Sequence, residues 1–294
     1  LPLPEGMSWE EAVDRIRALY PLKDGVISDF DQTEQMLRHF LKKASESTLS
    51  KPRVCICVPS GITGVESRAC VNAAVSAGAR KVYLIEEPVA AALGAGLDLS
   101  IPRGRFILDM GGGTTDIAVL SLNGIVCKKS IKLAGRKLDE AIVRCVRADR
   151  NVLIGEKMAE RIKIEVGSVF YTEDKVMEAK GRNLHTGLPE KFEIRTSDVY
   201  DALMEQVMQI VTSVQQILEI TPPELSADIW EDGLIMTGGG AMLDGLGELI
   251  SQHAKIKVRL AEHPVECVAV GTALSFSKLD ELYDGFVTPS THTH

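Results

Sequence analysis

Residues 106–120 read FILDMGGGTTDIAVL, and the rest of the chain is best understood outward from this stretch. Residues 105–109 have the apolar pattern of a buried strand, and residues 117–120 have the pattern of a returning strand. Backbone N–H groups in a glycine turn can approach a phosphate closely, because no side chain intervenes. We therefore expect a hairpin whose turn binds phosphate. The candidate contacts are the three glycines and the two hydroxyl residues that follow them: Gly111, Gly112, Gly113, Thr114 and Thr115.

A carboxylate flanks this turn on each side. Asp109 ends the first expected strand and Asp116 opens the second. Because Mg²⁺ usually keeps several waters and takes only one or two carboxylates, Asp109 is the candidate metal residue, acting through water. A ligand-free hairpin is the plainer alternative, since glycine runs often join strands. The two threonines and two carboxylates favour the phosphate and metal site. The dipeptide Gly-Lys does not occur in the sequence, which excludes a Walker A loop.

Composition places the chain among ordinary globular proteins. Its 294 residues are enough for a large core and two domains, and 45% of them are apolar and 25% charged. The net charge of −8 argues against nucleic acid as the main partner. No apolar run approaches the roughly 18 residues that a membrane-spanning helix needs.

Cysteine and histidine give no sign of a metal site. The six cysteines lie in apolar segments without a C-x-x-C pair, which is typical of reduced core cysteines in a cytosolic protein. The histidines show no H-E-x-x-H spacing, and the H-T-H at the end of the chain is the pattern of a loose tail.

Strand and helix patterns alternate before the glycine hairpin, which predicts an α/β fold. Strands are expected at 53–58 and 81–85, and helices at 9–19, from about residue 31, at 64–77 and at 89–97. Glu86 and Glu87 directly precede Pro88 at the start of the last of these helices. The helix dipole favours carboxylates at that place, which is a structural explanation for both.

The second half of the chain contains several expected helices and a second triple glycine. An amphipathic stripe predicts a helix at 138–146, and a second helix is expected at about 156–169. On that helix Glu160 and Lys163 are neighbours, and a surface ion pair is their plainer explanation. A β-like region at 175–194 and a long helix ending before Pro222 follow. A strand at 233–237 then runs into a second triple glycine, with a helix expected near residue 242, which is a weak anion-binding pattern by itself.

Taken in order, these segments resemble the actin-like ATPases, and specifically the bacterial rod-shape-determining MreB/Mbl-type family. The resemblance runs over about residues 21–273. Its most specific stretches are PLKDGVISDFDQTE, VYLIEEPVAAALGAG, DMGGGTTDIAVL, IGEKMAERIKIE, TGLP, TPPELSADI and TGGGAMLDGL. The resemblance implies an actin-like ATPase fold with two lobes, each built on an RNase-H-like sheet, around a nucleotide cleft. Lobe I would comprise 1–100 and 262–294, and lobe II 101–261, with 138–204 as a smaller subdomain.

The resemblance also implies roles for single residues. Glu87 matches the carboxylate that positions the attacking water, and Thr114 matches the threonine that helps it. Asp109 lies on the Mg²⁺ side of the second phosphate loop. The contacts to ribose and adenine, and the turn beneath the adenine, are implied at Glu160, Lys163, Gly239 and Gly240. We expect the helix dipole to keep Glu87 ionised and Glu86 to point elsewhere, where it would act on stability or on ribose contacts.

The implied function is a slow Mg²⁺-dependent ATPase, with ATP and Mg²⁺ as cofactors, that polymerises with itself on the inner face of the cell membrane. Its implied partners are transmembrane cell-wall elongation proteins. The family's first phosphate loop, a D-x-G-T hairpin, has no counterpart here, so we expect the chain to begin after it and lobe I to be incomplete. The family's N-terminal amphipathic membrane segment is absent too, and the loop before Lys51 carries only Leu49 as a large apolar residue.

Three alternatives stay open at the level of sequence. A heat-shock-70-type chaperone shares the phosphate loops, but it would continue into a substrate-binding domain, for which the few residues after Gly271 leave no room. A sugar or acetate kinase on the same fold would need a substrate base in the cleft and longer insertions. An inactive truncated paralogue would act only as an interaction protein.

Overall fold

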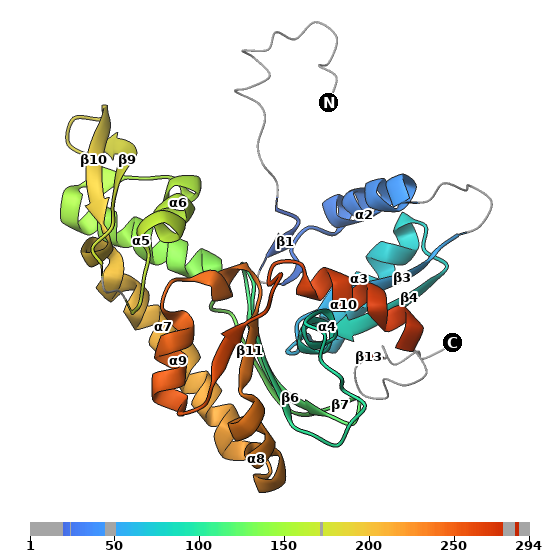
Figure 1. Cartoon of the computed structure of the whole chain (residues 1–294). Coiled ribbons are helices and arrows are strands. Elements are labelled where there is room, and N and C mark those ends of the chain that lie inside the picture. Colours follow the sequence, from blue (N-terminus) through green and yellow to red (C-terminus); the bar gives the residue numbers. More distant parts are fainter. Residues whose placement is uncertain (1–19, 24, 45–50, 171–172, 279–285, 288–294) are drawn as a thin grey trace, which may run out of the picture.

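The computed structural model describes most of the chain, and its elements are labelled in Figure 1. The described residues are 20–23, 25–44, 51–170, 173–278 and 286–287. The helix expected at 9–19 and the H-T-H at the end of the chain lie outside them. None of the described helices is both long and apolar enough to span a lipid bilayer.

A five-stranded mixed sheet carries the glycine hairpin. Its strands stand in the order β12-β11-β5-β6-β7, with β12, β11 and β5 parallel and β5, β6 and β7 antiparallel. Register pairs Met110 with Thr115, so residues 111–114 make the turn between β5 and β6. The expected RNase-H-like sheet is therefore present. The strands are β5 (Arg105–Met110), β6 (Thr115–Ser121), β7 (Gly124–Ile131), β11 (Leu234–Thr237) and β12 (Val258–Leu260).

A second sheet of three strands stands beside the first. In it β3 (Arg53–Val58) is parallel to β4 (Lys81–Glu86), and β13 (Phe286–Val287) adds to the other edge of β4 in the antiparallel direction. The helix α3 (Gly64–Ala77) connects β3 to β4. Its start is fixed by a capping box between Thr63 and Glu66. We call this sheet with its helices the smaller lobe, and the five-stranded sheet with its helices the larger lobe.

Two helices in backbone contact lie between the sheets. These are α4 (Glu87–Gly94) and α10 (Cys267–Ser275), at the centre of Figure 1. A Cβ on Gly271 would collide with the carbonyl oxygen of Ala90, and one on Gly94 with that of Cys267. Because both positions need glycine, the two helices approach as closely as backbones can. The apolar face of α4 packs with Ile107, Ala118, Leu120 and Ile235 of the five-stranded sheet.

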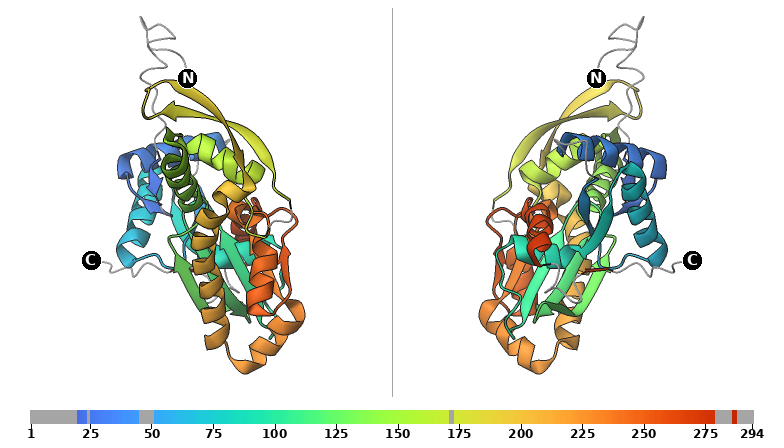
Figure 2. Two further views of the ribbon diagram at one scale, coloured as in Figure 1. Left: turned by 90° about the vertical axis from the view of Figure 1, so that its left-hand side faces the viewer. Right: turned by 90° about the vertical axis from the view of Figure 1, so that its right-hand side faces the viewer.

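The remaining elements complete the two lobes. The smaller lobe also contains β1 (Leu22–Lys23), β2 (Val26–Ile27), α2 (Phe30–Ala44) and η2 (Phe276–Lys278). The larger lobe contains α5 (Gly135–Arg150), β8 (Val152–Leu153), α6 (Glu156–Val166), β9 (Val176–Asn183), β10 (Pro189–Arg195), α7 (Thr196–Ile220), α8 (Pro223–Asp232), η1 (Gly239–Met242) and α9 (Leu246–Ala254). The hairpin β9–β10 protrudes at one end of this lobe and α8 lies at the other, in the view of Figure 1 and in both views of Figure 2.

Some expected boundaries were wrong for local reasons. The helix expected to reach residue 169 ends at Val166, because the backbone turns to an extended conformation at Gly167, whose φ is −68° and ψ is 128°. The helix expected near residue 242 is only a 3₁₀ turn there, and α9 begins after Gly245, whose φ is 79°. The helix expected at 89–97 is α4, which already begins at Glu87. The helix α8 was not expected, because the prolines before it were interpreted only as a stop, whereas Pro223 is its first residue.

Candidate functional site

The glycine turn is held in place by a hydrogen bond within it and by two hydrogen bonds from the start of α5. Its ends are closed by a bond from the Gly111 N–H to the Thr114 carbonyl at 3.0 Å. Gly135 and Arg136, at the start of α5, donate their N–H groups to the carbonyls of Gly111 and Gly112 at 3.1 and 2.9 Å. Among the described residues, the N–H groups of Gly112 and Gly113 have no hydrogen-bond acceptor. A Cβ on Gly112 would meet nothing within 4 Å. The turn therefore has two free donors, as an anion-binding turn requires.

Asp109 is a buried carboxylate beside this turn. Its Oδ1 accepts a hydrogen bond of 2.8 Å from the hydroxyl of Thr237, at the end of β11. Burial raises the pKa of Asp109 to about 6, although the Thr237 bond lowers it, and the charge of Asp116 raises it further. A cation next to Asp109 would favour its ionised form. The site therefore fits the expected Mg²⁺ residue, and Thr237 is a support that the sequence did not reveal.

Glu87 reaches the same turn from the smaller lobe. It is half-buried in the first turn of α4, and its Oε2 accepts a hydrogen bond of 3.3 Å from the Thr114 hydroxyl. Burial, and then the charges of Asp116 and Asp109, raise the pKa of Glu87 to about 9. The expectation that the helix dipole keeps it ionised is wrong for the metal-free protein. The dipole contributes at most about 2 kcal/mol, or roughly 1.5 pKa units, which is less than this upward shift.

Asp116 connects Glu87 to a loop of the smaller lobe. Its Oδ1 accepts the N–H of Ser60, in the loop after β3, at 2.8 Å. Its Oδ2 is buried and has no donor among the described residues. The charge of Asp116 is one cause of the raised pKa of Glu87, so the two carboxyl groups are close neighbours. Glu87 and Asp116 therefore interact where the two lobes meet.

Glu86 points away from the turn, as expected. Its carboxylate lies 2.6 and 2.7 Å from the ammonium of Lys128, on β7. Burial raises the pKa of Glu86, and the bond to Lys128 lowers it. The adjacent residues Glu86 and Glu87 thus face different partners on the larger lobe.

Lys163 lies next to the glycine turn on its other side. Its ammonium donates to the Gly135 carbonyl at 3.0 Å and pairs with Asp139 Oδ1 at 2.8 Å. The expected ion pair between Lys163 and Glu160 is not formed, and Glu160 is exposed. Asp139 lies on α5 and Lys163 on α6, so the spacing of residues within one helix could not reveal this pair.

The second glycine turn packs against the first. A Cβ on Gly240 would lie 2.6 Å from Met110 Cγ and 3.0 Å from the Gly111 carbonyl, so this glycine permits close packing. At Gly239 the nearest atom to a Cβ would be 3.9 Å away, on Val265, so Gly239 faces more open space. The hydroxyl of Thr115 does not face the turn. It donates to the Leu133 carbonyl at 2.6 Å inside the core.

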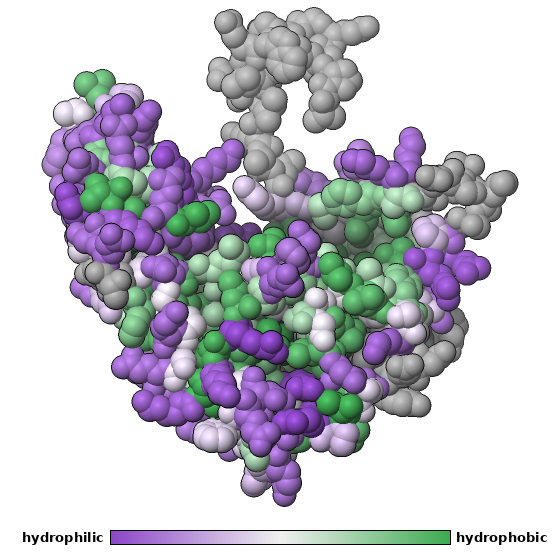
Figure 3. All heavy atoms as spheres, in the orientation of Figure 1, coloured by the Kyte–Doolittle hydropathy of each residue, from purple (hydrophilic) through white to green (hydrophobic). Residues whose placement is uncertain are grey.

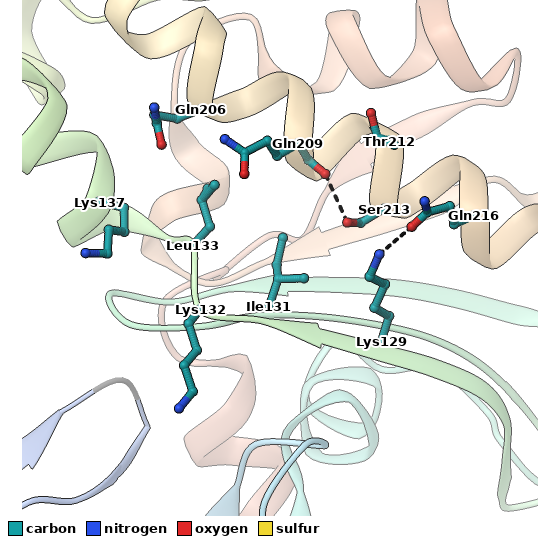
Figure 4. Close-up of a pocket in the computed structure, with 10 residues that line it drawn as sticks. All are labelled: Lys129, Ile131, Lys132, Leu133, Lys137, Gln206, Gln209, Thr212, Ser213 and Gln216. Carbon is teal, nitrogen blue, oxygen red and sulfur yellow. Dashed lines mark hydrogen bonds between the residues drawn. The ribbon is translucent and has the colours of Figure 1, made fainter.

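The surface of the molecule has a notch (Figure 3) and a separate cavity. Figure 3 shows a notch between the part built from α5, α6 and the β9–β10 hairpin and the part built from α2. A separate cavity of about 560 Å³ lies between β7 and α7, where Lys129 points toward Gln216 (Figure 4). Among the described residues, no group of three or more histidine, cysteine, aspartate or glutamate side chains is arranged to hold a metal ion. A metal at the turn would therefore rely on Asp109 with waters.

The fold and the site together define the class of protein. Two lobes, of which one is built on a complete RNase-H-like sheet, bring two glycine turns and the carboxylates Asp109 and Glu87 to one place. This is the actin-like ATPase fold.

Comparisons with known proteins narrow the class to a family. A family model described as MreB/Mbl protein matches residues 7–284. The cell shape-determining protein Mbl of Bacillus subtilis (strain 168) is 47% identical over 269 residues, which are 91% of this chain and 81% of that protein. The cell shape-determining protein MreB of Escherichia coli (strain K12) is 47% identical over 268 residues, 90% of this chain and 77% of that protein. The chain belongs to the MreB/Mbl family.

A solved structure agrees with this membership. MreB5 of Spiroplasma citri, crystallised bound to ADP and to AMPPNP, is 34% identical and superimposes with a TM-score of 0.84. The match covers 90% of this chain and 80% of that one.

Proposed function

We propose that this protein is an actin-like cytoskeletal ATPase that assembles with itself into filaments and determines cell shape. The observation that carries the proposal is the convergence of Asp109, Glu87 and Thr114 on a glycine turn in which two N–H groups, among the described residues, lack acceptors. Membership of the MreB/Mbl family supports it, because relatives from that family are named cell shape-determining proteins.

The residues at the glycine turn fit the two parts of a nucleotide phosphate site, which are the donors to phosphate oxygens and the carboxylate that holds the metal ion. The N–H groups of Gly112 and Gly113 would bind phosphate oxygens, Gly111 would shape the turn, and Asp109 would hold Mg²⁺ through waters. When bound, Mg²⁺ supplies neutralisation of the charge on the transferring phosphoryl group. Its charge would also favour ionised Glu87, which then accepts a hydrogen bond from Thr114 and orients the attacking water. We propose that Thr115 acts through its backbone, since its hydroxyl is bound to Leu133.

The nucleoside end of the site is proposed on the neighbouring helices and the second turn. Lys163 already lies beside the glycine turn, fixed by Asp139 and the Gly135 carbonyl. We propose Lys163 and the exposed Glu160 as the adenine and ribose contacts. Gly239 and Gly240 would form the turn beneath the adenine. The proposed lobe boundaries are those expected from the sequence, 1–100 with 262–294 and 101–261.

The cellular role is proposed from family membership. Slow hydrolysis would act as a switch on filament assembly. The filaments would lie in the cytoplasm on the inner face of the cell membrane, and would guide cell-wall synthesis through transmembrane elongation proteins.

The test of the site is nucleotide binding by an Asp109→Ala variant. Isothermal titration of the full-length protein with ATP at several Mg²⁺ concentrations should show Mg²⁺-dependent binding, and the variant should lose that dependence. Asp201→Ala is the matched control, because Asp201 is an exposed carboxylate on α7, away from the turn. Mg²⁺-dependent binding that is unchanged in Asp109→Ala would refute the metal assignment.

A further inference from the structure

One ion pair joins the two lobes next to Glu87. Lys128 belongs to β7 of the larger lobe and Glu86 to the last position of β4 in the smaller lobe. The ammonium contacts both carboxylate oxygens of Glu86, at 2.6 and 2.7 Å. Glu86 is only 6% exposed. Among the described residues, every other ion pair has both partners within one lobe.

Glu86, the smaller-lobe partner of this pair, fixes the position of the next residue, Glu87. Glu86 is the residue before α4, and its backbone is extended, with φ −74° and ψ 140°. Consecutive Cα atoms are about 3.8 Å apart, so holding the Glu86 carboxylate holds the start of α4 as well. The close backbone contact between α4 and α10 through Gly94 and Gly271 also holds this helix against its partner.

The larger-lobe end of the pair is tied to the Thr114 turn. Lys128 pairs with Ala118 in the antiparallel register of β7 and β6. The strand β6 begins at Thr115, directly after Thr114. The ion pair therefore links the strand that carries the Thr114 turn to the residue that precedes Glu87.

We propose that Lys128 is a positioning residue for hydrolysis, which sets the separation between Glu87 and the Thr114 turn by holding Glu86. This inference rests on the proposed function, because the positioned step is ATP hydrolysis. Among the described residues, the polar partner of Lys128 is the Glu86 carboxylate, and Lys128 acts only through it. Loss of the pair leaves the binding donors Gly112 and Gly113 in place and lets the two lobes change their spacing at Glu87.

A purely structural role is the alternative, since removal of Lys128 also leaves a buried carboxylate without its partner. The double variant Lys128→Met/Glu86→Gln separates the two roles, because it removes both charges together. Lys128→Arg keeps the charge and tests rescue. Lys129→Met is the matched control. The neighbouring Lys129 points to the opposite face of β7 and contacts Gln216 on α7, at the cavity of Figure 4.

The measurements are phosphate release, ATP affinity and thermal unfolding of the full-length protein and these variants. Displacement of a reacting group by about 1 Å can cost roughly 10²-fold in rate, so we expect Lys128→Met to lower kcat by roughly 10- to 100-fold. Affinity for Mg-ATP should stay within about twofold, because the binding donors are untouched. Lys128→Arg should recover most of kcat, and Lys129→Met should behave like the parent.

The double variant is the deciding one. We expect it to recover thermal stability while kcat stays low. Parent-level kcat in Lys128→Met, or recovery of both stability and kcat in the double variant, would overturn the inference while leaving the proposed function intact. A parent protein that binds no ATP and releases no phosphate would overturn both.

Discussion

Three carboxylates share a buried corner of the molecule without a cation among the described residues. Burial raises the pKa of Asp109 and of Glu87, and the charge of Asp116 raises both further. Such an arrangement costs folding stability, because ionised groups are held together away from water. Functional sites commonly carry this cost, and removal of one such charge commonly stabilises a protein. The carboxylate corner is therefore better explained by ligand binding than by folding.

The pH dependence of stability follows from the Glu87 pKa. A carboxyl group whose pKa is higher in the folded than in the unfolded protein stabilises the fold fully below its unfolded pKa, and this contribution is lost as pH rises through the folded pKa. For Glu87 the unfolded value is 4.5 and the folded value about 9. We predict that Glu87→Gln, measured in EDTA, melts at a higher temperature than the parent and that its advantage grows from pH 5 to pH 9.

Thermal melts of the two proteins across that pH range are the measurement. Glu66→Gln serves as a control carboxyl, since Glu66 lies at an exposed helix start and its pKa is lowered rather than raised. A Glu87→Gln advantage that is constant with pH would show that Glu87 is ionised in the folded metal-free protein.

Local sequence patterns were sufficient to predict the residues of the glycine turn, but not the residues that hold them in place. Asp109 and Thr114 could be predicted because strand, glycines and carboxylate are adjacent in the chain. Thr237, Asp139 and Lys128 could not, because each meets its partner from a distant segment. The dipole argument for Glu87 failed for the same reason. The charges that outweigh the dipole come from Asp116 and Asp109, on other strands.

Elements at the two ends of the larger lobe expose apolar side chains. At the β9–β10 end Leu188 is 64% exposed, and at the opposite end Trp230 on α8 is 70% exposed. Figures 1 and 2 show these elements at opposite ends of the lobe. When a surface at one end of a protein is complementary to a different surface at its other end, copies can stack head to tail. Such stacking generates open filaments. The arrangement supports the proposed self-association.

Substitution at one end should therefore block assembly without affecting nucleotide binding. We predict that Trp230→Glu pellets far less than the parent with ATP and anionic liposomes, because a charge replaces an aromatic side chain at the proposed contact. Pelleting and electron microscopy are the measurements, with calorimetry to confirm that ATP still binds. Val75→Glu, an exposed apolar position on α3 away from both ends, is the control. Filaments of Trp230→Glu indistinguishable from those of the parent would exclude this end as the contact.

Helices and strands were predicted best where the apolar spacing agreed with the residues that mark the ends of an element. The strand at 53–58 and the helix at 64–77 have the expected bounds, because a capping box and Gly78 mark the ends of α3. Boundaries failed where the backbone conformation of a single residue ended or began a helix, as at Gly167 and Gly245. The apolar spacing continued past both places, so it contained no sign of the boundary.

The two lobes contribute different parts of one site. Glu87 comes from α4 of the smaller lobe, and Thr114 and Asp109 come from the larger lobe. Contacts of this kind join segments that no local pattern relates. Alternation of strands and helices predicted an α/β fold, but the two-lobed arrangement was expected only from the resemblance to actin-like ATPases.

Hydrolysis tests the central claim most directly, because it requires both lobes at once. Phosphate release and ATP affinity should be measured side by side for the full-length parent, Glu87→Ala and Glu86→Ala. Loss of a positioned acid–base group lowers turnover by roughly 10²- to 10⁴-fold, and we predict such a loss for Glu87→Ala with nearly unchanged ATP affinity. Glu86→Ala should slow turnover less and lower thermal stability, since it leaves Lys128 without its partner. Parent-rate hydrolysis by Glu87→Ala, or abolition of chemistry by Glu86→Ala alone, would contradict this account.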